Sequence, residues 1–294
     1  MDDIPNNKSI CGCKGVRICA LCENTERASK LQKNRFDFSS CETYIYVWPE
    51  TKTAIKIEPI DAEVPIPIDR LFEIQQSLIE SSMAGQSMVC DDVLLVPDFL
   101  TEQEESDLVA KIDSQPWLLS QSGRRKQDYG PKVNFKQRKL KLDHYSGMPA
   151  YSRPLLDKMC ALGPALSNYV PFELCNLEYD PDRRSCIDFH RDDTWVWGER
   201  LISVNLLSAS AMSLLYDGHA KRLVYVPMPR RSLLCMAGPM RYEWTHAVLP
   251  DHITHRRIAL TMREPSTNFR PDGQLYDKWG RTLIERASNL IDPQ

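Results

Sequence analysis

His190-Arg191-Asp192 is the stretch of sequence that decides how this chain is read. Residues two apart on a β-strand point to the same face, so a strand here would aim His190 and Asp192 at one metal ion while Arg191 points away. His246 follows far enough along the chain for several strands to bring it back to the same place. Two histidines and one carboxylate suit Fe(II) and leave coordination positions open. We therefore predict that His190, Asp192 and His246 bind Fe(II).

A pair of arginines strengthens this prediction. Arg257 and Arg263 are six residues apart in a segment that reads as a strand, so their side chains share one face. A planar guanidinium group binds a carboxylate through two parallel hydrogen bonds. An open Fe(II) site has room for a chelating 2-oxoacid and for O2, and the far carboxylate of the 2-oxoacid needs a cation. The pair is therefore predicted to bind the co-substrate rather than to lie on a solvated face.

The bulk composition is ordinary for a globular protein. The 294 residues are 42% hydrophobic and 26% charged, and the net charge of −3 does not indicate a dedicated nucleic-acid binder. The sequence has no apolar run long enough to cross a bilayer, and its first residues lack the apolar core of a signal peptide. Ten cysteines without such a signal favour a reducing compartment. We expect the protein to be located in the cytoplasm and nucleus and not to associate with a membrane.

A cysteine cluster occupies the first segment, residues 1–40. Four thiols lie close together in this segment, at Cys11, Cys13, Cys19 and Cys22. They could bind one tetrahedral Zn²⁺ as a zinc knuckle. The alternative is a set of free thiols on a tail.

The next segment, residues 41–90, is predicted to hold a hairpin and a linker helix. Residues 43–48 and 53–57 alternate as two strands around a Pro-Glu-Thr-Lys turn. A proline-containing linker at 59–67 follows, and apolar residues at helical spacing indicate a short helix over 71–79.

Residues 91–270 are predicted to form a jelly-roll domain. Residues 93–100 read as a strand that leads into a helix whose first turn carries the Thr101/Glu104 capping box, and a second helix is expected over 155–166. Short strands separated by turn residues follow, at 201–207, 212–216, 222–226, 232–236, 242–248 and 258–262. The fold class is therefore mainly β with flanking helices around a double-stranded β-helix (jelly-roll) core. A helical tail at 271–294 ends the chain.

These motifs together resemble the AlkB-type Fe(II)/2-oxoglutarate dioxygenases, most closely the AlkB homologue 4 branch. Besides H-x-D…H and R-x5-R, the matching stretches are SQSGRRKQDYG at 120–130, CNLEY at 175–179 and PRRSLL at 229–234. The cysteine cluster also resembles the N-terminus of that branch. The resemblance covers roughly residues 93–269.

The resemblance implies roles for individual residues. His190, Asp192 and His246 would bind Fe(II), Arg257 would pair with the distal carboxylate of 2-oxoglutarate, and Arg263 would lie near its metal-bound end. Further co-substrate residues would be Tyr179 and Asn176, although Asn176 stands one position away from its usual place in the family. A lid over the substrate would span 120–141 and include Arg124, Arg125 and Tyr129.

The implied reaction is an oxidative demethylation. With O2, 2-oxoglutarate would be converted to succinate and CO2, and an N-methyl group would leave as formaldehyde. We expect methylated lysine in protein as the substrate, mostly because the resemblance to this branch implies it, and also because the global positive charge of a DNA-binding enzyme is missing. The alternatives are N6-methyladenine or another N-methylated base in DNA or RNA, or a non-catalytic module that recruits partners through its cysteine cluster and the Lys- and Arg-rich stretch at 123–141. His252 and His255 are rival metal ligands, but their charged neighbours indicate an exposed turn.

Overall fold

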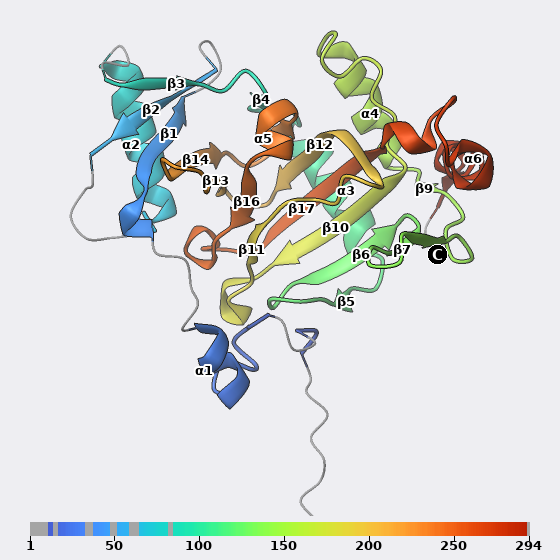
Figure 1. Ribbon diagram of the computed structural model, residues 1–294, viewed down its shortest axis with the longest axis horizontal. Helices are drawn as coiled ribbons and strands as arrows, with labels where there is room; N and C mark the ends of the chain where they lie inside the picture. Colours follow the sequence, from blue (N-terminus) through green and yellow to red (C-terminus); the bar gives the residue numbers. More distant parts are fainter. Residues whose placement is uncertain are drawn as a thin grey trace, which may run out of the picture.

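Two seven-stranded sheets lie face to face and form the core of the fold (Figure 1). The structure is a computed structural model that describes residues 11–13, 17–32, 38–47, 52–58, 65–81 and 85–292. Apolar side chains from both sheets fill the space between them, among them Tyr46, Leu177, Leu214 and Val224. This arrangement confirms the predicted jelly-roll core with flanking helices.

The minor sheet contains the predicted hairpin and both predicted histidine ligands. Its strand order is β11 (Ile187–His190), β16 (Thr245–Val248), β13 (Ser210–Tyr216), β14 (Arg222–Met228), β1 (Glu42–Val47), β2 (Thr53–Ile57) and β3 (Ser87–Val89). β1 and β2 pair antiparallel as predicted, and β1 also runs parallel to β14. The hairpin therefore extends the jelly-roll sheet. The predicted turn residues 49–51 and linker residues 59–64 lie outside the described residues.

The major sheet carries the arginine pair on one of its central strands. Its order is β4 (Val93–Val96), β15 (Leu233–Met236), β12 (Trp197–Leu206), β17 (Arg257–Pro265), β10 (Glu173–Tyr179), β6 (Arg125–Tyr129) and β5 (Leu118–Leu119). Two further pairs of short strands lie beside it: β7 (Lys132–Asn134) with β8 (Lys139–Lys141), and β9 (Met148–Pro149) with β18 (Leu290–Ile291).

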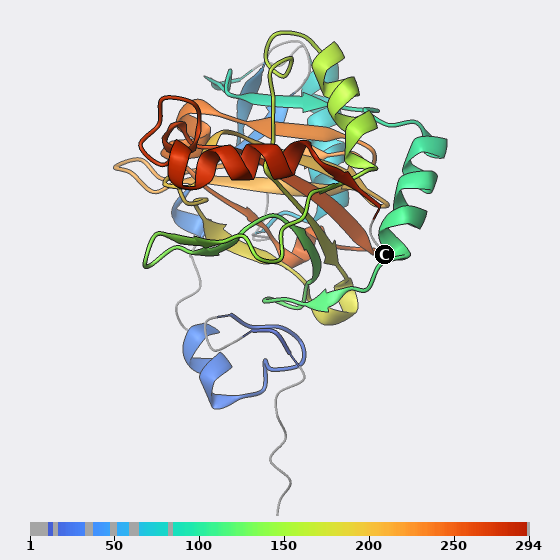
Figure 2. The same cartoon turned by 90° about the vertical axis from the view of Figure 1, so that its right-hand side faces the viewer.

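Helices cover the outer faces of both sheets (Figures 1 and 2). Three helices cover the major sheet, namely α3 (Glu102–Asp113), α4 (Ser152–Ala161) and α6 (Arg281–Ser288), through apolar residues such as Ile112, Met159 and Leu283. α2 (Ile68–Glu80) packs on the minor sheet through Leu71 and Ile74. The predicted capping box of α3 is present, because the Thr101 hydroxyl oxygen accepts a hydrogen bond from the Glu104 amide and the Glu104 carboxylate accepts one from the Thr101 amide. Among the described residues, no helix has the length and apolar character needed to cross a membrane.

Two segments differ from the sequence predictions. The strand expected over 242–248 starts at Thr245, because Gly238 and Pro239 open the short helix α5 (Gly238–Tyr242). The tail contains a π-helical turn (Tyr276–Gly280) before α6, and its last residues form β18 rather than more helix.

His252 is also placed differently from the prediction of an exposed turn. It is fully buried, and its Nε2 lies 3.0 Å from the carbonyl oxygen of Ile66. The ring of Tyr225 packs against it edge-on, with ring centroids 5.4 Å apart. Burial lowers the pKa of His252 to about 4, so it stays neutral in the folded protein at neutral pH.

This buried histidine should make the protein acid-sensitive. The pKa of His252 is about 4 when folded, below its ordinary value of 6.5, so the unfolded chain takes up the proton first as the pH falls. We expect the free energy of unfolding to decrease by about 2 kcal/mol between pH 7 and pH 5 through this group. Urea unfolding of His252→Gln should show that much less pH dependence. The matched control is His255→Gln, an exposed neighbour, and an equal change in both variants would contradict the assignment.

Candidate metal centre and co-substrate pocket

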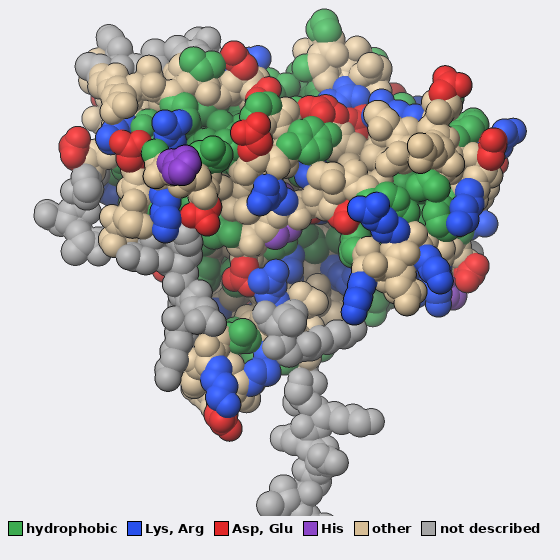
Figure 3. Space-filling model, in the orientation of Figure 1, with side chains coloured by type: hydrophobic (Ala, Val, Ile, Leu, Met, Phe, Trp, Pro, Cys, Tyr) green, Lys and Arg blue, Asp and Glu red, His purple; other side chains and the backbone are tan. Residues whose placement is uncertain are grey.

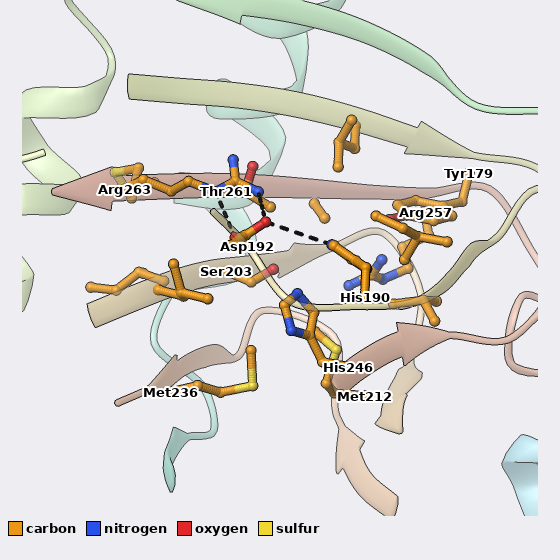
Figure 4. A pocket seen from close by; sticks show the side chains of 17 residues that line it. Tyr179, His190, Asp192, Ser203, Met212, Met236, His246, Arg257, Thr261 and Arg263 are labelled. Atoms are coloured by element: carbon orange, nitrogen blue, oxygen red, sulfur yellow. Dashed lines mark hydrogen bonds and ion pairs between the residues drawn. The ribbon is translucent and has the colours of Figure 1, made fainter. Parts of the chain in front are cut away.

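The structure brings the three predicted metal ligands together. His190 at the end of β11 lies opposite His246 of β16 in the register of the two strands. The ligand atoms of His190, Asp192 and His246 all lie within 4.8 Å of one another, and Figure 4 shows the three side chains facing one another. The Nε2 atom of His190 is 3.6 Å from Oδ1 of Asp192. These three groups could hold one metal ion and leave its remaining positions open.

Asp192 does not owe its position to a strand, as the sequence argument assumed. β11 ends at His190, and Asp192 lies in the loop that follows. Arg263 holds its carboxylate instead, with Nε 2.8 Å from Oδ2 and Nη2 3.3 Å from Oδ1. Arg263 also donates a hydrogen bond to the carboxylate of Glu173, with 3.4 Å between Nη1 and Oε2. The predicted arginine therefore lies beside the metal ligands and orients one of them.

Arg241, which the sequence analysis missed, holds the main chain of the same loop. Its guanidinium group is fully buried and donates hydrogen bonds to the carbonyl oxygens of Asp192 at 2.8 Å and Asp193 at 3.1 Å. In return, Arg191 donates to the carbonyl oxygen of Tyr242 at 3.3 Å. The two arginines therefore connect the loop to α5. No pattern in the sequence distinguishes Arg241 from other arginines, so its role could not be predicted.

The electrostatics of the site favour the forms that bind a metal. Burial opposes the charge of Asp192, but Arg263 outweighs it and holds the pKa of Asp192 well below its ordinary value. Burial, with His190 beside it, lowers the pKa of His246 to about 3. The Nδ1 atom of His190 lies 2.8 Å from the carbonyl oxygen of Asp188, which leaves Nε2 for the metal. At neutral pH the site thus presents a carboxylate and a neutral His246.

Arg257 is built to receive a carboxylate. Its side chain is 1% exposed, and its Nε donates a 2.6 Å hydrogen bond to Oδ1 of Asn205. Its Nη1 and Nη2 atoms have no partner among the described residues, although both are buried. Tyr179 packs against the guanidinium at 4.9 Å from the ring centroid. A buried cation with two unused donors fits one end of 2-oxoglutarate.

The cavity joins the metal ligands to Arg257. Tyr179, Ser203 and Thr261 supply polar groups around it, and Figure 4 shows the labelled side chains around one space. The rest of the lining is mostly apolar and includes Leu177, Ile187, Leu201, Met212, Met236 and Val248. Such a lining excludes water, which strengthens every charge interaction inside.

Comparison with known proteins agrees with this geometry. The family model of the 2OG-Fe(II) oxygenase superfamily matches residues 92–263. The chain belongs to that superfamily. A "DNA N6-methyl adenine demethylase" of Caenorhabditis elegans is 46% identical, over 97% of this chain and 97% of that one. The human "Alpha-ketoglutarate-dependent dioxygenase alkB homolog 4" is 37% identical over 94% and 93% of the two chains. Among solved structures, OsALKBH1 has a TM-score of 0.44 and 13% identity, and covers 59% of this chain and 98% of its own.

These findings confirm the resemblance to AlkB-type enzymes and to the homologue 4 branch. The protein is a 2-oxoglutarate-dependent dioxygenase with Fe(II), 2-oxoglutarate and O2 as its cofactors.

Asn176 does not line the pocket, in contrast to its predicted role. Three positions separate it from Tyr179, so the two side chains point to opposite faces of β10. Its amide nitrogen donates to Oε1 of Gln127 at 2.8 Å and to the hydroxyl of Tyr151 at 2.7 Å. The buried amide that contacts a pocket residue is Asn205, which accepts the hydrogen bond from Arg257. That residue could have been found as the single amide in the apolar stretch 201–207.

The three predicted lid residues have different surroundings. Arg124 lies over the ring of Tyr179 at 5.9 Å, which brings it near the pocket. Arg125 forms an ion pair with the buried Glu178, so it joins β6 to β10. Tyr129 packs edge-on against Tyr151 with centroids 6.3 Å apart. Among the three, the geometry favours a substrate contact only for Arg124.

The cysteine cluster has the arrangement of a closed metal site. The sulfur atoms of Cys11, Cys13, Cys19 and Cys22 lie within 4.8 Å of one another, and three of these side chains are buried. Cys19 Sγ and Cys22 Sγ are 3.8 Å apart. That distance is far longer than a disulfide bond, and it equals the edge of a tetrahedron with Zn–S bonds of about 2.3 Å. The four thiols therefore fit Zn²⁺.

Arg257 should determine the affinity for 2-oxoglutarate. Arg257→Lys keeps a charge but loses the two parallel donors, so we expect the Kd for 2-oxoglutarate to rise about 10- to 100-fold. Calorimetric titration with Mn(II) in place of Fe(II) measures this without turnover. The matched control is Arg256→Lys, whose side chain pairs with Asp113 and Glu178 outside the pocket and should leave the Kd unchanged. Equal losses in both variants would show that the effect is not specific to the pocket.

Proposed function

We propose that this protein removes the methyl group of N6-methyladenine in DNA. The main observation in favour of oxidative demethylation is that the buried Arg257, with two unused hydrogen-bond donors, lies in the same pocket as His190, Asp192 and His246. The demethylase of Caenorhabditis elegans, 46% identical along nearly the whole chain, supports this substrate. The sequence alone favoured methylated lysine in protein, so this proposal takes up what was then the alternative.

The oxidant of the reaction is O2, and Fe(II) held by His190, Asp192 and His246 would activate it together with 2-oxoglutarate. One oxygen atom is incorporated into succinate as CO2 leaves, and the other leaves with the methyl carbon as formaldehyde. Arg257 anchors a carboxylate of 2-oxoglutarate, and Arg263 keeps Asp192 ionised and oriented. The apolar lining around Met212 and Met236 keeps bulk water out.

A basic hairpin supports a nucleic-acid substrate. The β7–β8 hairpin carries five exposed Lys or Arg residues and no acidic residue, and they are Lys132, Lys136, Arg138, Lys139 and Lys141. Phe135, in the turn between the strands, is 49% exposed. Basic side chains that track phosphates and an aromatic ring that stacks on bases are the usual components of a nucleic-acid surface. Figure 3 shows Lys and Arg gathered over the region of β6 and β7, beside a hollow in the molecular surface.

Methylated lysine is the second candidate, and two carboxylates favour it. Asp128 of β6 and Glu173 of β10 lie on the face that also carries Leu177 and Tyr179. Carboxylates on this face would attract a methylated ammonium group. Burial raises the pKa of Glu173 to about 7, however, so half of its charge is lost near neutral pH.

Parallel assays should separate the two substrates. We expect loss of the methyl group from an N6-methyladenine oligonucleotide and less from a methyl-lysine peptide, measured by mass spectrometry with formaldehyde release. His190→Ala should abolish both formaldehyde release and succinate formation, because a metal ligand is lost. Faster turnover of the peptide would reverse the substrate assignment. Turnover unaffected by His190→Ala would refute the iron site.

The hairpin should act on binding rather than on chemistry. Replacing Lys136, Arg138 and Lys139 by Gln should raise the KM for the oligonucleotide about tenfold and weaken its salt dependence, with kcat unchanged. The control has the same charge change on the minor-sheet side of the molecule, at Lys52, Arg70 and Lys221. An equal rise in KM in the control would show that only net charge matters.

A further inference from the structure

The cysteine-cluster segment is attached to the catalytic domain at residue 120 and at residues 183–188, just before His190. Gly12 lies against the residue that follows β5. A Cβ atom at this position would be 2.4 Å from the carbonyl oxygen of Ser120. The amide of Ala20 donates to the carbonyl oxygen of Arg183 at 3.3 Å. Figure 1 shows this segment below the barrel, near the ends of β10, β11 and β6. The cluster therefore packs on the loop regions at residues 120 and 183 of the catalytic domain.

Two ion pairs join the same parts of the chain. Arg17, between the second and third cysteines, is 2.9 Å from the carboxylate of Asp188. Glu23, just after the fourth cysteine, is 2.8 Å from Arg184. Arg27 donates a 2.9 Å hydrogen bond to the carbonyl oxygen of Arg17 and so holds that residue within the segment. The contacts converge on residues 183–188, immediately before the ligand His190.

β11 depends on such support because the sheet holds it weakly. It is an edge strand of the minor sheet, with β16 as its one neighbour in the sheet. Its register with β16 shifts between Ile187 and His190, so the ladder is irregular at the point where the ligand stands. An edge strand with an irregular ladder needs contacts from outside the sheet to keep one position.

Asp188 connects these contacts to the imidazole of His190. Its side chain pairs with Arg17, and its carbonyl oxygen lies 2.8 Å from Nδ1 of His190. The partner of the second imidazole nitrogen sets the tautomer and orientation of a metal-binding histidine, and its loss typically costs 10- to 100-fold in metal affinity. A shift of Asp188 would therefore turn the ring of His190.

We propose that the cysteine cluster, loaded with zinc, is a positioning element of the iron site. Zinc folds the segment that carries Arg17, Arg17 holds Asp188, and Asp188 orients His190. The proposal rests on the proposed oxygenase chemistry only in that it concerns the same iron site. Arg17 and Asp188 are positioning residues, since neither touches the metal or the substrate.

Mn(II) affinity tests this proposal in the full chain without any turnover. Mn(II) favours nitrogen and oxygen donors over thiolates, so it reports on the His190 site. Free Mn(II) is followed by electron paramagnetic resonance at saturating 2-oxoglutarate, and zinc content is measured in parallel. Cys13→Ser/Cys22→Ser should lose its zinc and bind Mn(II) about tenfold more weakly. Wild-type protein should contain one zinc per chain.

Variants that keep all four cysteines of the cluster distinguish a loss of positioning from misfolding of the segment. Arg17→Gln and Asp188→Asn should retain zinc and weaken Mn(II) binding roughly 3-fold each, because the pair is partly exposed. The double variant should be no weaker than either single one, and the charge reversal Arg17→Asp/Asp188→Arg should restore most of the affinity. The control is Glu26→Gln, which removes an exposed pair with Lys30 on the same segment and should change nothing.

Two outcomes would overturn the proposal. One is unchanged Mn(II) affinity in a folded, zinc-free cysteine variant. The other is full affinity in both Arg17→Gln and Asp188→Asn, which would exclude transmission through Asp188. Because Mn(II) binding involves no methylated substrate, a failed demethylation assay with these effects intact would reject only the proposed function.

Discussion

The ion pair between Arg263 and Asp192 is the interaction on which the rest of the site depends. Asp192 lies in the loop after the edge strand of the minor sheet, whereas Arg263 lies on β17 in the middle of the major sheet. Their 2.8 Å contact therefore joins the two sheets at the metal site. A carboxylate buried in an apolar cavity would take up a proton if nothing compensated its charge, and it would then be a poor ligand. The guanidinium group keeps it ionised, so the same contact supplies both the position and the charge state of the ligand.

Three arginines near the metal ligands have separate tasks, and the number of donors each leaves without a hydrogen bond distinguishes them. Arg263 is occupied by the carboxylates of Asp192 and Glu173. Arg241 is occupied by main-chain carbonyl oxygens, with only its Nε left over. Arg257 keeps both terminal nitrogens without a partner among the described residues. A buried guanidinium group without hydrogen bonds is costly, so the arginine with two free donors is the one that awaits a ligand. That difference supports the proposal that Arg257 binds the co-substrate, and it does so without reference to the metal.

The sequence predicted those parts of the site that depend on local spacing. Arg257 and Arg263 share a face because they lie on one continuous strand, and alternation along a strand can be read from sequence. Asp192 was identified correctly, but the physical reason was different, because the strand ends before it. Arg241 could not be predicted, since its role depends on where α5 meets a loop almost fifty residues away in the chain. The attachment of the cysteine cluster beside His190 depends in the same way on tertiary contacts, whereas its four thiols were evident from their spacing.

The donor atoms of the two candidate metal sites indicate different roles: a structural role for the cysteine cluster and a chemical role for the site of His190, Asp192 and His246. Four sulfurs close the coordination of a tetrahedral ion, so a metal bound by the cysteine cluster has no position left for a substrate. Two imidazoles and one carboxylate leave positions open, and soft thiolates and harder nitrogen and oxygen donors favour different ions. The closed site can therefore influence the reaction only through the protein, and Arg17 and Asp188 offer a path of two direct contacts to His190. A closed site suits the proposed task because a metal that exchanges no ligands during turnover would keep Arg17 and its partner Asp188 in one place.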